Sequence, residues 1–269
     1  MSIGFSKNFN LERVLLWKVL QLYERTPTIP RNEIMSQAGI GSLKVAGMQG
    51  WLSRLGFRDS REKTITDLGR LLLQHDTHFE LHGTMWVIHY QLANDPETEV
   101  WHILTNDLVY RRAEFTRQDA LRLLVEEKGL RSYGDQHLRS DVTIYFNAFT
   151  RDEGLGATNF IREDQGNKGV YIKGKPRGVH PLLVAYVIYS QRARRYPEAT
   201  MIGIDRLLNE DGNVGKVFSL TEEDLLEVIR ELHFDKVVDY SSTADLNHIW
   251  FTFKGDPLDL LRRYYEEAS

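Results

Sequence analysis

The sequence contains no cysteine among its 269 residues. Disulfide bonds, thiol nucleophiles and cysteine-ligated zinc are therefore excluded, and any metal ion would be bound by histidine, aspartate or glutamate. No apolar run approaches the roughly 20 residues that a membrane-spanning helix needs. Residues 1–10 also lack the basic and then apolar order of a signal peptide. We therefore expect a cytoplasmic protein that has no membrane partner.

Neither sign of charge is in large excess, because the formal net charge is only -4. The positive and negative residues are nevertheless unevenly distributed along the chain. Residues 1–75 contain eleven Lys and Arg against six Asp and Glu, a net charge of +5. The remaining residues contain 23 against 32, a net charge of -9. A basic end on an acidic body predicts contact with DNA through that end, with the other surface left for protein partners or solvent. Chance clustering of solvated charges is the alternative.

Residues 1–76 predict a winged helix-turn-helix domain that binds DNA. Gly39 is expected to end the second helix, Gly41 and Ser42 to supply a turn and an N-cap for the third, and Thr66 to cap the last. The expected elements are helices over 11–25, 31–38 and 42–55, two short extended pieces over 57–65, and a helix over 66–74. Helix, helix-turn-helix and then a strand–turn–strand wing is the winged-helix order.

The apolar spacing also predicts which helix faces are buried in this domain. The stripes expected to face the core are Leu11, Val14, Leu15 and Leu22 in the first helix, and Val45, Met48, Leu52 and Leu55 in the third. On a helical wheel the third helix then exposes Leu43, Ala46, Gly47, Gly50, Ser53 and Arg54, with Lys44 and Gln49 at the flanks.

Two glycines inside the third helix require a reason, because each costs roughly 1 kcal/mol of helix propensity relative to alanine. Close approach of the helix to DNA is one reason, and close approach to another helix is the other. The residues predicted to bind DNA are Lys44, Gln49, Arg54, Arg58, Arg61 and Lys63. Most of them would meet phosphates, so we expect weak base readout and a steep salt dependence. A protein-interaction module is the alternative function for such a domain.

Residues 77–178 predict a helical middle region with an irregular basic loop. Helices are expected over 80–94 and 115–128 and around 140–147, and the loop over 154–177 contains a strand at 169–173. The loop contains five cations, Arg162, Lys168, Lys173, Lys175 and Arg177. It could be a second edge that contacts phosphates or a solvated interdomain loop. His89, which should share a face with His82, Met85 and Trp86, is expected to be packed and hydrogen-bonded rather than a metal ligand.

Residues 179–269 predict a second, winged-helix-like domain. Helices are expected over 181–196, 200–209 and 221–233, followed by a hairpin over 236–241 and 248–253. The helix over 221–233 carries five acidic residues against one arginine, a charge that repels phosphate. We expect this acidic domain to interact with proteins. The whole chain is therefore expected to be mostly α, in the α+β class.

Several short motifs resemble a bacterial family encoded with DNA phosphorothioation genes, typified by the SspB nicking protein. They are the run Thr84-Met-Trp-Val-Ile-His-Tyr90, Asn106, Ser140-Asp141-Val142, Val217-Phe218-Ser-Leu220, Gly39-Ile-Gly41 and Trp51-Leu52. The family pattern has Lys-Asn after Gly41 and an arginine later in the helix. Ser42-Leu43 and Gln49 stand in those regions here, and Lys44 restores one cation.

The resemblance implies a DNA-binding protein of a phosphorothioate modification system, which nicks DNA to support sulfur incorporation. Such restriction-modification systems serve anti-phage defence, and the implied partners are double-stranded DNA, a cysteine desulfurase, an ATPase and a sulfur-transfer protein. A metal-dependent nickase would use Mg²⁺ or Mn²⁺. His89, Asp141 and Tyr145 are the catalytic candidates, because they lie in or beside the helices that carry the motifs. The alternative role for Asp141, next to Ser140, is to cap a helix start. The alternative is a non-enzymatic DNA-binding adaptor or transcriptional regulator that recruits protein partners.

Overall fold

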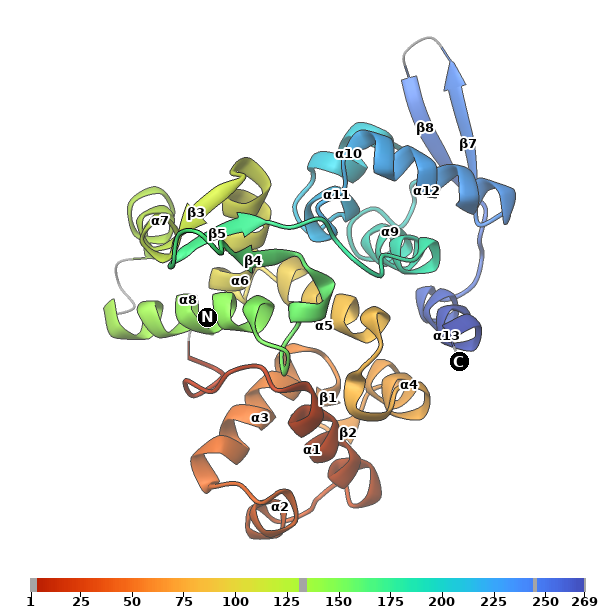
Figure 1. The fold of residues 1–269 in the computed structure, drawn as a ribbon. Coiled ribbons are helices and arrows are strands. Elements are labelled where there is room, and N and C mark those ends of the chain that lie inside the picture. Colours follow the sequence, from red (N-terminus) through yellow and green to blue (C-terminus); the bar gives the residue numbers. More distant parts are fainter. Residues whose placement is uncertain (1–3, 131–134, 244–245, 269) are drawn as a thin grey trace.

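The computed structural model describes residues 4–130, 135–243 and 246–268. This part of the chain is mostly helical and contains three small antiparallel sheets, which confirms the expected α+β class. Figure 1 shows an N-terminal group of helices, a central group and a C-terminal group, arranged in chain order. No helix in the described ranges is long and apolar enough to cross a membrane.

The N-terminal elements follow the predicted order. They are α1 (Arg13–Arg25), α2 (Arg31–Ala38), α3 (Ser42–Arg54), the strands β1 (Arg58–Asp59) and β2 (Thr64–Ile65), and α4 (Asp67–His75). Gly39 ends α2 in the left-handed conformation, and the Thr66 hydroxyl accepts a hydrogen bond from the Gly69 amide at 3.1 Å, both as expected. The N-cap of α3 is Gly41 rather than Ser42, which is the first helical residue and caps nothing.

Burial in these helices agrees with most of the predicted stripes. The α3 stripe of Val45, Met48, Leu52 and Leu55 is fully buried. Val14 of α1 was expected in the core but is 49% exposed, because α1 buries Leu16, Val19 and Leu20 instead.

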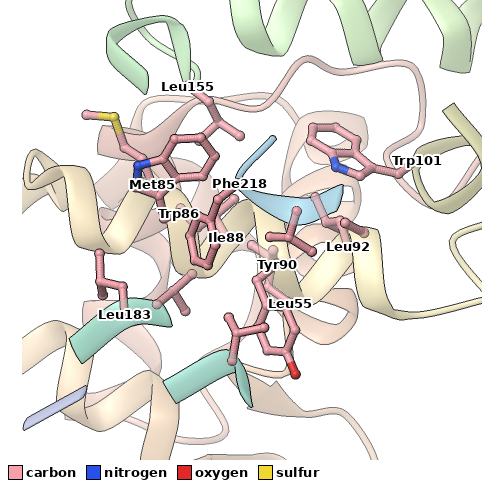
Figure 2. Close-up of a cluster of buried hydrophobic side chains, with 14 of the residues drawn as sticks. Leu55, Met85, Trp86, Ile88, Tyr90, Leu92, Trp101, Leu155, Leu183 and Phe218 are labelled. Atoms are coloured by element: carbon pink, nitrogen blue, oxygen red, sulfur yellow. The ribbon is translucent and has the colours of Figure 1, made fainter. Parts of the chain in front are cut away.

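The central elements surround one helix that is buried on nearly every side. They are α5 (His82–Asn94), α6 (Glu99–Ile103) with a π-helical continuation (Leu104–Val109), β3 (Glu114–Thr116), α7 (Arg117–Arg122) with a π-helical continuation (Leu123–Glu127), α8 (Asp135–Thr150), β4 (Ile161–Glu163) and β5 (Val170–Lys173). In α5 every residue from Gly83 to Asn94 except Gln91 is buried. The predicted face with Met85, Trp86 and His89 is therefore no more buried than the other faces of this helix. Figure 2 shows Met85, Trp86, Ile88 and Tyr90 of α5 within a cluster of buried side chains.

Two predictions for the middle region need correction. The segment predicted as a helix from residue 115 begins with β3, and the irregular loop contains two strands rather than one. Both differences have the same cause, since β5 lies between β3 and β4, with Phe115 opposite Tyr171 and Arg162 opposite Ile172.

The C-terminal elements are α9 (Pro181–Arg195), β6 (Met201–Gly203), α10 (Ile204–Asn209), α11 (Val214–Val217), α12 (Glu222–Phe234), β7 (Val238–Thr243), β8 (Leu246–Phe251) and α13 (Pro257–Ala268). The helix α12 occurs where it was predicted, and each strand of the β7–β8 hairpin is displaced by two residues from its predicted bounds. The helix expected from residue 200 begins only at Ile204, because Met201–Gly203 pairs with β8. The short helix α11 and the terminal helix α13 were not expected.

Contacts cross both predicted domain boundaries. Arg13 donates hydrogen bonds to the carbonyl oxygens of Gly154, Asp152 and Phe79, which joins α1 to the middle of the chain. The hydroxyl of Tyr264 in α13 accepts a hydrogen bond at 3.0 Å from the amide of Gly83 in α5. The division into residues 1–76, 77–178 and 179–269 stays a prediction.

Candidate nucleic-acid interface

Tyr23 of α1 holds two of the six residues predicted to bind DNA. The guanidinium of Arg58 lies 4.0 Å from the centre of the Tyr23 ring, a cation–π contact. The side-chain amide of Gln49 donates a hydrogen bond to the Tyr23 hydroxyl at 2.5 Å. The hairpin and α3 are therefore both fixed to the end of α1, and Arg58 and Gln49 are held in place before any ligand binds.

Two further predicted residues are paired with carboxylates. The Lys44 ammonium lies 2.8 Å from a Glu12 oxygen. Arg54 lies 2.7 Å from Glu97 and 3.6 Å from Asp95. A phosphate would have to compete with these acids, so Lys44 and Arg54 attract DNA less than their charges suggest.

The remaining two predicted residues, Arg61 and Lys63, lie exposed at the tip of the β1–β2 hairpin. Neither forms an ion pair with the residues that the structure describes. The Asp59 carboxylate accepts hydrogen bonds from the Arg61 and Glu62 amides at 2.7 and 2.9 Å, which shapes the tip. These backbone hydrogen bonds, from Glu62 first, lower the pKa of Asp59. The tip therefore presents two exposed cations on a turn whose single aspartate is occupied by backbone amides.

The glycines of α3 make room for the chain's own N-terminal segment, residues 4–10. A Cβ at Gly50 would collide with the Phe5 carbonyl oxygen, and one at Gly47 would lie 2.5 Å from the Ser6 carbonyl oxygen. The close approach is therefore to another segment, neither to DNA nor to a helix. Gly47 is buried, contrary to the predicted exposure of this face. The exposed residues of α3 are Ser42, Leu43 and Ser53, which carry no charge.

Asp141 connects the same N-terminal segment to α8. Its carboxylate accepts a hydrogen bond at 2.9 Å from the Gly4 amide, and burial raises its pKa to about 6. It lines a pocket of about 20 Å³, room for a single water molecule. The other lining residues are Phe5, Ser6, Trp51, Thr98, Glu99, Val100, Trp101 and Ile144.

His89 and Tyr145, the other predicted catalytic residues, lie in the core. Nε2 of His89 donates to the Val217 carbonyl oxygen at 3.1 Å, and Nδ1 accepts from the Trp101 indole, also at 3.1 Å. Burial lowers the pKa of His89 to about 3, so the ring is neutral. Burial also raises the pKa of Tyr145, whose hydroxyl lies 3.2 Å from that of Thr105. His89 is packed and hydrogen-bonded, as expected, and the structure does not bring the three candidates together at one surface.

A metal ion needs a set of ligands, and the described residues contain no group of three His, Asp or Glu side chains placed to hold one. Asp141 and Glu99 line the same pocket, and the buried Ser6 hydroxyl there has no hydrogen-bond partner among the residues that the structure describes. Mg²⁺ usually keeps several waters or phosphate oxygens. A pocket of about 20 Å³ walled by aromatic rings does not fit a hydrated Mg²⁺ together with a DNA phosphate.

The family described as "Protein of unknown function (DUF4007)" matches residues 7–265. The chain belongs to this family. No curated protein matches the sequence. Two solved structures are similar over 98% of this chain and 88% of theirs, at 17% sequence identity: a magnesium ion-bound SspB, with a TM-score of 0.81, and an SspB, with a TM-score of 0.79. The SspB-type resemblance predicted from the sequence is confirmed, and this DUF4007 chain has the SspB fold.

The motifs that carry the resemblance contribute to the core of the DUF4007 fold. Trp86 lies in an edge-to-face contact with Phe218, with ring centres 5.2 Å apart, as the cluster in Figure 2 illustrates. The side-chain oxygen of Asn106 accepts a hydrogen bond from the Gly212 amide at 2.7 Å. Trp86, Phe218 and Asn106 of these motifs therefore help to hold the core together.

The second basic region lies on the β3–β5–β4 sheet and the segment after it. Arg162, Lys168, Lys175 and Arg177 are exposed, whereas Lys173 is half-buried and desolvation lowers its pKa. Either interpretation of this region, a phosphate-contacting edge or a solvated loop, fits these positions.

The sequence analysis did not predict the residues that hold the DNA-binding candidates. Tyr23, Glu12 and Glu97 set the orientation and charge of Gln49, Arg58, Lys44 and Arg54. Glu12 is separated from Lys44 by 32 residues, and Glu97 from Arg54 by 43. Ion pairs between residues so far apart in the sequence cannot be predicted from local sequence patterns.

Proposed function

We propose that this protein binds duplex DNA through its N-terminal elements, which act as a winged helix, within a bacterial DNA phosphorothioate modification and defence system. One observation carries the proposal: the hairpin of the basic N-terminal unit presents Arg61 and Lys63, both exposed and unpaired with any described acid. The SspB fold and the motifs shared with that family support the cellular role.

Phosphate contacts would supply most of the affinity. Arg61 and Lys63 reach from the hairpin, and Arg58 is oriented by Tyr23 at its base. The exposed residues of α3 offer the bases no charged or bidentate donor. The half-buried Lys44, Gln49 and Arg54 are already bonded to Glu12, Tyr23 and Glu97. Binding would therefore depend steeply on salt and little on sequence.

A salt titration of DNA binding tests the proposal. Fluorescence anisotropy with a labelled duplex would compare the wild type with a variant carrying Arg61→Ala and Lys63→Ala. The slope of log K against log salt should flatten by about 0.9 for each lost phosphate contact. A matched control carries Arg230→Ala and Lys254→Ala, two exposed C-terminal cations. An unchanged slope in the hairpin variant would remove the hairpin from the interface.

The proposal also includes DNA nicking and assembly with a desulfurase, an ATPase and a sulfur-transfer protein. Only the resemblance to the SspB-type family supports these two activities. Asp141 is the predicted catalytic residue that adjoins a pocket, although that pocket is too small for Mg²⁺ together with a phosphate. The test incubates the protein with supercoiled plasmid, with and without Mg²⁺ or Mn²⁺. Open-circular product that disappears in Asp141→Asn would support a nickase, whereas nicking that persists in this variant would reject Asp141.

A non-enzymatic adaptor is the second candidate function. The core positions of His89 and Tyr145 favour it, because neither side chain reaches a surface where a phosphodiester could bind. An adaptor would shift DNA in gels and leave supercoiled plasmid intact under every metal condition.

A further inference from the structure

A groove of about 260 Å³ runs along one side of α12. Its apolar lining comes from Val179, Leu220 and Val228, together with Pro176 and Pro181. The wall formed by α12 consists of Asp224, Glu227, Val228 and Glu231. These positions follow the i, i+3, i+4, i+7 spacing, so they form one continuous stripe of the helix. Lys175 is the one cation among the described residues that line the groove. The groove therefore combines an apolar floor with a wall that carries more negative than positive charge.

The carboxylates of this wall differ in the hydrogen bonds and ion pairs that they form within the chain. Asp224 accepts a hydrogen bond from the Thr221 hydroxyl at 2.7 Å and lies close enough to Lys175 for that cation to lower its pKa further. Glu227 and Glu231 are exposed, and their carboxylates form no hydrogen bond or ion pair with any described residue. Two free negative charges thus lie one helical turn apart beside Val228.

The same side of α12 continues to a large exposed apolar side chain. Phe234 is 85% exposed and follows Glu227 by seven residues, or two turns. The stripe from Asp224 to Phe234 is about 15 Å long, which matches roughly three turns of a bound helix.

We propose that this groove binds a basic amphipathic segment of a partner protein, with Lys or Arg side chains one turn apart around a small apolar side chain. The cations would meet Glu227 and Glu231, and the apolar side chain would cover Val228. Nucleic acid does not suit this surface, because Lys175 already lies near Asp224 and the phosphates would still face the carboxylates of Glu227 and Glu231. The proposal is independent of DNA binding.

The positions of the two surfaces are compatible with simultaneous binding. Figure 1 shows α12 on the opposite side of the molecule from α2 and α3. A partner on α12 would therefore leave the N-terminal hairpin free for DNA.

Isothermal titration with a synthetic peptide tests the groove. The probe is an amphipathic helical peptide with lysines one turn apart on either side of an alanine. The test variant carries Glu227→Gln and Glu231→Gln, which keep helix propensity and remove both charges. The control carries Glu126→Gln and Glu127→Gln, which remove the same charge from an exposed site outside the groove. Circular dichroism confirms that both variants are folded.

The wild type should bind one peptide, and the groove variant should lose about tenfold or more in affinity, while the control variant changes little. A second variant, Val228→Asn, should weaken the same peptide at high salt, where the charge contribution is screened. Equal losses in the groove and control variants would show non-specific charge attraction and overturn the proposal. Absence of peptide binding, or binding of duplex DNA that is lost in the groove variant, would also overturn it.

Discussion

The indole N–H of Trp101 donates a hydrogen bond to Nδ1 of His89 at 3.1 Å, and this bond fixes the imidazole as the Nε2–H tautomer. The other ring nitrogen donates to the Val217 carbonyl oxygen. The pair joins α5 to α6 and α11 in a site without solvent. A protonated His89 would leave the Trp101 N–H without an acceptor and place a charge among aromatic rings.

We therefore expect His89 to make stability depend on pH. Its pKa falls from the ordinary 6.5 to about 3 in the fold, so its contribution is fully present above pH 6.5 and is lost as the pH falls toward 3. His89→Gln should be less stable than the wild type at pH 7, yet should lose less stability between pH 7 and pH 5. Urea unfolding at several pH values measures this difference, and parallel pH profiles would contradict it.

Gly50 provides a test of how α3 packs. Gly50→Ala should destabilise the protein by about 1–3 kcal/mol, because its Cβ would collide with the Phe5 carbonyl oxygen. If the glycine served only to approach DNA, the substitution would instead stabilise the helix by roughly 1 kcal/mol and weaken DNA binding. Gly166→Ala is the control, since a Cβ at Gly166 would meet only a carboxylate oxygen of Asp164, at 3.7 Å. Thermal unfolding and anisotropy together distinguish the two explanations.

The N-terminal elements could be predicted because their signals are local. Gly39 and Thr66 mark helix ends through their own backbone and hydroxyl chemistry. The strands β3 and β6 could not be predicted, since each has three residues and exists only because a strand far along the chain pairs with it. The position of the hairpin cations could be predicted because it also depends on local sequence signals. The ion pair between Lys44 and Glu12 could not be predicted, because it joins residues that are far apart in the sequence.

Asp141 gives a pH dependence of the opposite sign to His89. Burial raises its pKa from 3.8 to about 6, so the stability it contributes is fully present below pH 3.8 and is lost as the pH rises through 6. Asp141→Asn keeps an oxygen that can accept from the Gly4 amide and removes the charge. The variant should be more stable than the wild type at pH 8, by about 1–2 kcal/mol, and no more stable at pH 4. An equal difference at both pH values would show that the carboxylate is not desolvated.

Glu97 meets Arg54 at 2.7 Å, where it would compete with a phosphate if the N-terminal unit binds DNA as proposed. Glu97→Gln keeps a hydrogen-bond acceptor and removes the negative charge, so a phosphate could replace it on the guanidinium. If α3 faces DNA as proposed, affinity at low salt should rise about two- to fivefold, and the salt slope should steepen by up to about 0.9, the value for one more phosphate contact. Glu126→Gln, a surface glutamate on the α7 continuation, controls for the change in net charge. An affinity that rises equally in both variants would place Arg54 outside the interface, whereas a steeper slope in Glu97→Gln alone would place the end of α3 beside the phosphates.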